Sequence, residues 1–290
     1  MLFTPANRAR ALSRRLARLA GAVLLAAPLY SAAPETALDR YVKTPDAHFK
    51  YELVGKIRGK GYTAYVLDMT SQQYLSTAEV NHPIWRHWLT VVKPTKVVSD
   101  IGLLFIRGGN NGDAVPKSAD PLAVHIATMT GAAVAVLNMV PNQPLVFHGE
   151  VRERVEDAII AYTWSKYLHT GDEKWPLRLP MTKAAVRAMD AVTEFLASPA
   201  GGKVNVDRFV VSGESKRGWT TWTTAAVDQR VVAIIPGVID VLNIGPSFLH
   251  HYRAYGAYSS DVDDYVDAGI MQWAGTEEYK NLMQIVEPFS

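Results

Sequence analysis

The chain has 290 residues, 48% of them hydrophobic and 20% charged, which is typical of a globular protein with a sizeable core. Its formal net charge is +2, but residues 1–33 hold five arginines and no acid, so residues 34–290 carry 25 basic and 28 acidic side chains, a net charge of −3. This mildly acidic balance argues against nucleic acid as a partner, and the absence of cysteine excludes disulfides and a thiol nucleophile.

Residues 1–33 are predicted to be an export signal peptide. Five arginines lie before or at the edge of the apolar run Leu19–Leu29, and Ser31, Ala32 and Ala33 offer small residues for cleavage. The run is too short to cross a bilayer, so we expect no stable membrane span after the signal is removed. The alternative is a basic amphipathic helix on a cytosolic protein. We therefore predict a periplasmic or secreted protein whose residues 34–290 form one domain.

The first part of that domain is predicted to be an extended lead-in over residues 34–50, followed by antiparallel strands. Runs of aromatic and β-branched residues separated by glycine or polar turns favour these strands. They cover residues 51–57, 63–69 and 84–92.

Beyond them, aliphatic runs alternate with stretches of helical periodicity. The expected strands, each buried in the sheet, are 101–106, 132–139, 209–211 and 231–235, and the expected helices are 120–130, 152–168, 180–196 and the Thr/Ala-rich run after Ser215. Alternating strands and helices predict an α/β fold: a mostly parallel sheet, with antiparallel N-terminal strands and helices on both faces. Ligands of such folds bind at the carboxyl ends of the strands.

The stretch Phe209–Trp222 combines a strand, a sharp turn and a helix, with Ser215 at the apex of the turn. This is the pattern of the nucleophile elbow of α/β-hydrolases, with the second glycine one residue late (Gly213-x-Ser215-x-x-Gly218). Lys216 and Arg217 fall in the first turn of the helix, where the helix dipole disfavours cations. A cation beside a nucleophile stabilises an oxyanion, so we predict Ser215 as the nucleophile, with Lys216 also acting in catalysis and binding the oxyanion. The alternative is a glycine-rich turn whose charges point into water.

The glycine-rich loop 107–112 follows the predicted strand 101–106. It lacks the spacing of phosphate-binding and dinucleotide-binding loops, and the sequence predicts no cofactor. In a hydrolase this position supplies the second oxyanion N–H, which we assign to Gly109 and Asn110. A plain glycine turn is the alternative.

A serine nucleophile needs a base and an acid, which in this fold follow it in the order acid, then histidine. Asp240 lies after the strand that follows the elbow and is the candidate acid, and the alternative is that it is a helix N-cap or turn residue. Only His250 and His251 come later, in an aromatic segment that also suits a lid. No further buried strand follows residue 235, so we expect a C-terminally truncated domain whose acid and histidine lie beyond residue 290. No zinc motif or calcium loop is present, and we predict no metal.

Several long motifs resemble the PhoPQ-activated pathogenicity-related protein family. They are KGYTAYVLDMTSQQY (60–74), WRHWLTVVKP (85–94), SKRGWTTWTTAAVD (215–228) and HHYRAYG (250–256). The resemblance implies an exported bacterial protein with an α/β-hydrolase fold and a link to virulence. The family also includes a eukaryotic secreted proliferation repressor, so no shared substrate is implied. The elbow is also similar to that of glucuronoyl esterases, which implies that the Lys216 side chain assists the oxyanion.

The sequence thus predicts an exported serine hydrolase acting on an ester or peptide bond of a small-molecule or peptide substrate. The alternative is a non-catalytic secreted binding or signalling protein on a hydrolase fold. A third reading, a carbohydrate-related role, rests on aromatic residues near and after the elbow: Trp219, Trp222, Tyr252, Tyr255 and Tyr258.

Overall fold

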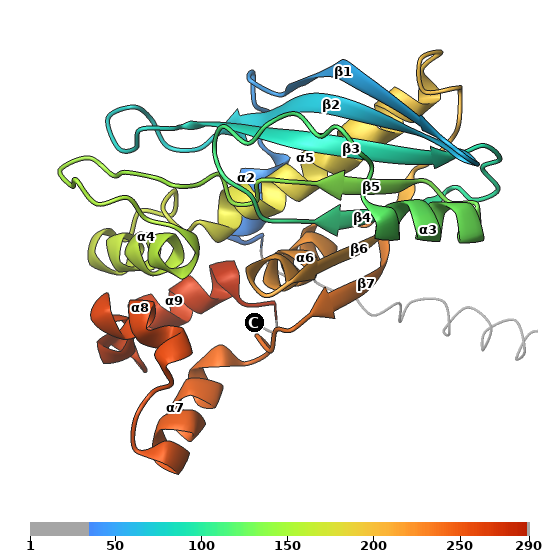
Figure 1. Ribbon diagram of the computed structural model, residues 1–290. Helices are drawn as coiled ribbons and strands as arrows, with labels where there is room; N and C mark the ends of the chain where they lie inside the picture. Colours follow the sequence, from blue (N-terminus) through green and yellow to red (C-terminus); the bar gives the residue numbers. More distant parts are fainter. Residues whose placement is uncertain (1–34, 289–290) are drawn as a thin grey trace, which may run out of the picture. The chain divides into compact units, whose positions relative to one another are not determined.

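Within residues 35–288, which the computed structural model describes, a seven-stranded sheet has the order β1-β2-β3-β5-β4-β6-β7 (Figure 1). The predicted signal at residues 1–33 lies outside this range. The strands are β1 Lys50–Gly59, β2 Tyr62–Gln73, β3 Ile84–Pro94, β4 Ile101–Ile106, β5 Val134–Leu137, β6 Arg208–Glu214 and β7 Val231–Gly237. The pairs from β1 to β5 are antiparallel, and β5, β4, β6 and β7 are mutually parallel. The predicted α/β class is confirmed.

The helices follow the predicted alternation closely. They are α2 Ala37–Lys43, α3 Pro121–Thr130, α4 Glu156–Thr170, α5 Arg178–Ala197, α6 Lys216–Val227, α7 Ile244–Tyr255, α8 Asp263–Asp267 and α9 Glu277–Val286. The expectation of an extended lead-in over residues 34–50 is wrong, because α2 lies within it. Thr36 and Asp39 form a capping box that satisfies the first N–H groups of this helix.

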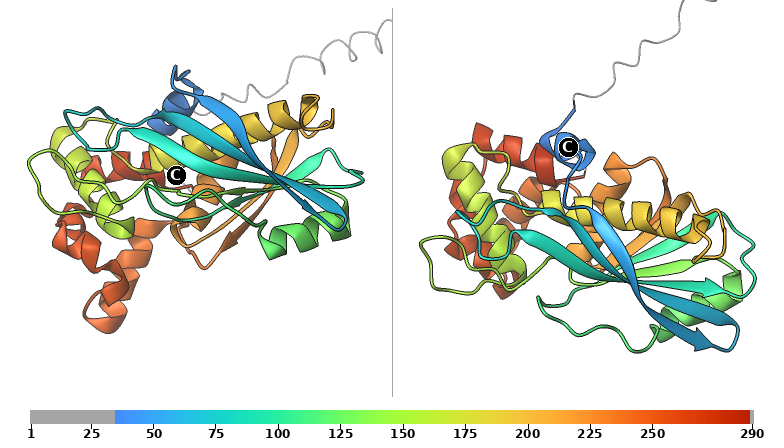
Figure 2. Two further views of the ribbon diagram at one scale, coloured as in Figure 1. Left: turned by 45° about the horizontal axis from the view of Figure 1, so that its top comes forward. Right: turned by 90° about the horizontal axis from the view of Figure 1, so that it is seen from above.

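Helices cover both faces of the sheet, as the alternation of side chains in β5 shows. Val134 and Val136 pack with Ala123 and Ala127 of α3, whereas Leu137, whose side chain points the other way, belongs to the cluster that includes α5. Figure 2 (left) shows the sheet between α3, in green, and α5, in gold. Since strands with apolar residues on both faces need cover on both sides, this layering follows from the aliphatic runs.

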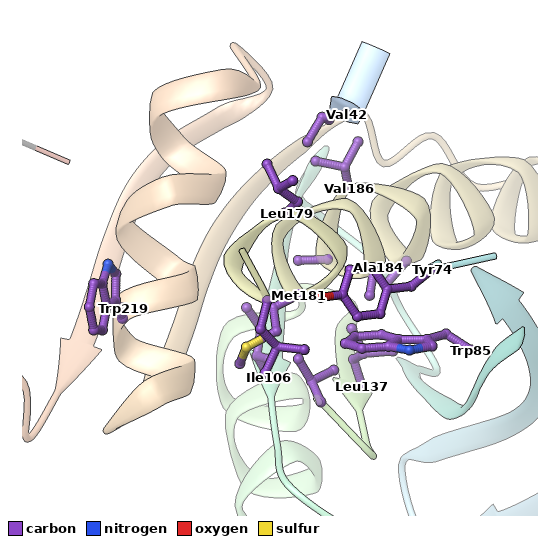
Figure 3. Close-up of a cluster of buried hydrophobic side chains, with 14 of the residues drawn as sticks. Val42, Tyr74, Trp85, Ile106, Leu137, Leu179, Met181, Ala184, Val186 and Trp219 are labelled. Atoms are coloured by element: carbon purple, nitrogen blue, oxygen red, sulfur yellow. The ribbon is translucent and has the colours of Figure 1, made fainter. Parts of the chain in front are cut away.

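The larger core lies between the sheet and α5, which is buried along most of its length. Figure 3 shows Met181 of this helix beside Ile106 of β4 and Leu137 of β5, whereas Leu179 lies on the side of α5 toward Val42 of α2. Tyr74 and Trp85 meet edge to face there, with ring centroids 5.7 Å apart. The chain from Thr36 onward forms one compact unit around this core.

The strand at the far edge, β7, departs from its predicted burial. It pairs with β6 along one side, and Val232 and Ile235 are 47% and 57% exposed. The prediction of a buried strand over 231–235 is right in position but wrong in burial. An aliphatic run indicates that a strand will form, whereas burial needs a neighbour on each side, and no described residue pairs with the outer edge of β7.

Candidate active site at the turn between β6 and α6

The predicted elbow is a sharp turn in which Ser215 stands alone between a strand and a helix. β6 ends at Glu214, α6 begins at Lys216, and the Ser215 backbone has φ 55° and ψ −124°. A non-glycine residue in such a conformation stores about 1–3 kcal/mol and persists only where its surroundings hold it. The Ser215 N–H donates to Gly237 O at 2.9 Å, which ties the turn to β7.

Both glycines of the motif are required by close packing. A Cβ on Gly213 would lie 2.6 Å from the backbone oxygen of Arg217. A Cβ on Gly218 would lie 2.6 Å from Ile239 Cγ2 and 2.8 Å from Gly237 O. Gly218, the third residue of α6, is therefore a position at which this helix packs too closely on the end of β7 to admit a side chain.

The cations of the first turn of α6 are paired with acids that open α4. Arg217 forms a two-pronged ion pair with Glu156, at 2.8 Å (Nη1 to Oε2) and 2.5 Å (Nη2 to Oε1). Lys216 Nζ lies 2.7 Å from Asp157 Oδ2 and 3.5 Å from Glu156 Oε2. Burial disfavours the Glu156 carboxylate, but the hydrogen bonds and charge of Arg217 outweigh burial and hold its pKa below the usual value. Neither cation simply points into water. The helix dipole disfavours cations in the first turn of a helix, and here the ion pairs with Glu156 and Asp157 compensate for this unfavourable placement.

A buried cation that the sequence analysis did not single out lies behind the turn. Arg178, the first residue of α5, donates from Nη1 to Lys216 O at 2.9 Å and to Thr220 Oγ1 at 2.7 Å. Its guanidinium lies over the Trp219 ring, 4.3 Å from the ring centroid. Burial lowers the pKa of Arg178 to about 9, which still leaves the side chain charged at neutral pH. Nothing local in the sequence marks this arginine, because its partners are about 40 residues away.

A cavity of about 210 Å³ opens beside Ser215. It brings the predicted acid Asp240 together with Ser215 and Lys216. Its other walls are mainly aromatic or acidic side chains from α4, α6, α7 and the segment after α7: Trp164, Trp219, Phe248, Tyr265, Asp157 and Asp261. The Tyr265 hydroxyl donates to Asp157 Oδ1 at 3.0 Å, so Asp157 is held from two sides.

No histidine lines this cavity in the part of the chain that the structure describes. His251 Nε2 instead accepts a hydrogen bond from Ser259 N–H at 3.1 Å, and its ring lies parallel to that of Tyr258. His250 is exposed on the same helix. The two histidine candidates are therefore placed with α7 and not beside the serine.

The loop after β4 lies next to the elbow, because Ile106 is paired with Gly213 in the parallel register. A Cβ on Gly108 would lie 2.7 Å from Arg217 Nη2, which shows how closely the loop packs on the elbow. The Asn110 N–H donates to Asp113 Oδ2 at 2.8 Å. For Asn110 to bind an oxyanion, this N–H must be released by Asp113.

Among residues 35–288, no three histidine or carboxylate side chains gather as a metal site requires. No helix within this range combines the length and the apolar character needed to cross a membrane.

The strand order, with a strained serine turn after the parallel strand β6, defines the α/β-hydrolase fold. A solved acetyl xylan esterase from Paenibacillus shares this fold with a TM-score of 0.53 and 14% identity, over 87% of this chain and 71% of that one. An acetyl xylan esterase from Thermoanaerobacterium aligns with a TM-score of 0.43 and 13% identity, over 87% of this chain and 80% of that one.

Residues 38–290 match the family of the PhoPQ-activated pathogenicity-related protein, and the chain belongs to that family. Over 273 residues it is 37% identical to autocrine proliferation repressor protein A of Dictyostelium discoideum. The match covers 92% of this chain and 54% of that relative, so the chain spans about half of the relative's length.

Proposed function

We propose that this protein is a serine hydrolase that cleaves an ester or peptide bond, with Ser215 as the nucleophile. The observation that carries the proposal is the backbone of Ser215, held at φ 55° between β6 and α6 beside a cavity. Strain of this kind collects at functional sites, and a residue at this apex exposes its hydroxyl to substrate. The hydrolase fold and the family agree with this chemistry.

In the proposed reaction, the Ser215 hydroxyl attacks the substrate carbonyl and loses its proton to a histidine base. The Lys216 backbone N–H, at the N-terminus of α6, receives the negative charge that develops on the carbonyl oxygen. The Lys216 ammonium adds positive charge nearby, although Asp157 holds it at 2.7 Å. Gly109 and Asn110 supply the second donor once Asp113 releases the Asn110 N–H. Asp240 orients the base, which is a histidine outside the described lining of the cavity, and the base returns the proton to the leaving group.

Labelling with a fluorophosphonate probe tests the nucleophile. We expect wild type to be labelled and Ser215→Ala to remain unlabelled. Ser247→Ala is the matched control, because Ser247 lines the same cavity from α7 and should be dispensable. Equal labelling of wild type and Ser215→Ala would remove Ser215 as the nucleophile.

Because no histidine lines the described cavity, we also expect added imidazole to raise the labelling rate of wild type and not that of Ser215→Ala.

A second candidate function is a secreted binding or signalling protein that keeps the fold without catalysis. The absence of histidine from the described cavity lining and the pairing of Lys216 with Asp157 favour it. A relative is named a proliferation repressor, which also fits a signalling role. This alternative predicts that Ser215→Ala leaves biological activity intact in the complete protein.

Export is proposed from the N-terminal sequence. The N-terminus of the mature protein, read by mass spectrometry after cell fractionation, tests it.

A further inference from the structure

Arg178 is a charged side chain with almost no contact with water. It is 1% exposed, and its Nε and Nη2 have no hydrogen-bond partner within the described structure. Its Nη1 donates to Lys216 O and to Thr220 Oγ1 of α6, and it also lies 3.7 Å from Met181 Sδ on α5 itself. An ion buried with unsatisfied N–H groups is costly, and an apolar side chain of similar volume is often at least as stable in such a position. General stability therefore does not account for an arginine here.

The hydrogen bond from Arg178 to Lys216 O indicates which part of the structure this buried arginine stabilises. The carbonyl group that Arg178 holds belongs to Lys216, the residue directly after Ser215, so the hydrogen bond acts on the backbone of the strained turn. On the opposite side, the Ser215 N–H is held by Gly237 O of β7. The turn is thus fastened to β7 before Ser215 and to α5 after it. A strained conformation needs contacts of this kind on both sides.

We propose that Arg178 is a positioning residue of the elbow, which pins the first turn of α6 and thereby holds Ser215 in its positive-φ conformation. This inference rests on the proposed function only in taking Ser215 as the nucleophile. The packing of the Arg178 guanidinium on Trp219, a wall of the Ser215 cavity, couples the same side chain to the shape of that cavity.

Arg187 provides a matched control on the same helix. Like Arg178 it lies over an aromatic ring, that of Phe49 at 5.3 Å, and its Nε has no hydrogen-bond partner in the described chain. Its Nη1 pairs with Asp190 on α5 itself and not with α6. Replacing either arginine with methionine removes a partly satisfied cation from α5. Only Arg178→Met also removes the hydrogen bond to Lys216 O in the elbow.

Hydrogen exchange followed by mass spectrometry tests the proposal without requiring catalysis. In Arg178→Met we expect peptides covering residues 215–220 to exchange at least 10-fold faster than in wild type, whereas peptides from β2 and β3 remain unchanged. Arg187→Met should leave residues 215–220 as protected as in wild type. Arg178→Lys, which keeps one charged donor, should give an intermediate rate. Equal protection of residues 215–220 in Arg178→Met and Arg187→Met would overturn the proposal.

A second measurement separates this inference from the proposed function. If Ser215 is the nucleophile, Arg178→Met should slow fluorophosphonate labelling by 10-fold or more per folded molecule, and Arg187→Met should not. If wild type is not labelled at all, the proposed function fails, and the exchange data still decide the role of Arg178. Should Arg178→Met fail to fold, the comparison of Arg178→Lys with Arg187→Lys decides it, because only the former should loosen residues 215–220.

Discussion

The strands β5 and β7 have similar sequences but very different surroundings. β5 (VAVL) is buried at every position, between β3 and β4 and with helices on both faces. β7 (VVAIIPG) has exposed side chains along much of its length, and Figure 1 shows it at the edge of the sheet. The same aliphatic chemistry thus produces a core strand in one place and an exposed apolar edge in the other. Strand formation is a local property, but burial depends on what lies alongside.

The largest contrast is expected between matched truncations in the two strands. Leu137→Ala, in fully buried β5, should lower the free energy of unfolding by about 2–5 kcal/mol, because it removes buried surface and leaves a cavity. Ile235→Ala, in β7, should cost below about 1 kcal/mol because water already reaches more than half of that side chain. Urea denaturation of both variants measures the difference. Similar losses at the two positions would show that β7 is covered in solution.

The buried histidine of β3, His87, should make the free energy of unfolding depend on pH. His87 of β3 is enclosed beside β5, with Nδ1–H donating to Asn138 O at 3.1 Å and Nε2 accepting from the Ser71 hydroxyl at 2.9 Å. Burial lowers the pKa of His87 to about 4, although the backbone carbonyls of Asn138 and Met139 oppose the shift.

Since the folded pKa lies below the unfolded value of about 6.5, protons bind the unfolded chain more readily, and stability is lost as pH falls from 6.5 to 4. The loss attributable to His87 is about 3 kcal/mol. Urea denaturation at pH 7 and pH 4 in wild type and His87→Gln measures it. His87→Gln should be less stable than wild type at pH 7 but should lose less stability between pH 7 and pH 4. Equal losses in the two proteins would show that His87 is not the source of the acid sensitivity.

The smallest effect on stability is expected from charging the exposed edge. Val232→Lys and Ile235→Lys together should change the free energy of unfolding by below about 1 kcal/mol, since both side chains are largely solvated. The same pair should reduce self-association of the protein, because an unpaired apolar edge strand is a template for other chains and lysine blocks it. Sedimentation velocity at increasing concentration checks this. An unfolded double variant would contradict the picture of an open edge.

Local sequence signals placed most elements and the serine turn correctly. The helix from Pro121 to Thr130 begins at an Asp120 N-cap and ends at Gly131, both within the chain segment that defines it. The elbow is recognisable from the sequence because its strand, its glycines and Ser215 stand within one short segment, although Ile239 and Gly237, which press on Gly218, are supplied by a more distant part of the chain. The helix at Ala37–Lys43 was missed, although the Thr36–Asp39 capping box marks its start.

By itself, then, the sequence determined the alternation of strands and helices, the family and the serine at the apex of its turn, because these depend on residues a few positions apart. Only the tertiary structure decided which groups surround that serine. Glu156 meets Arg217 across 61 positions, Arg178 meets Lys216 across 38, and β7 is left at an edge although its sequence is apolar. Charge pairing and burial act through space, so they are settled only when distant segments pack together.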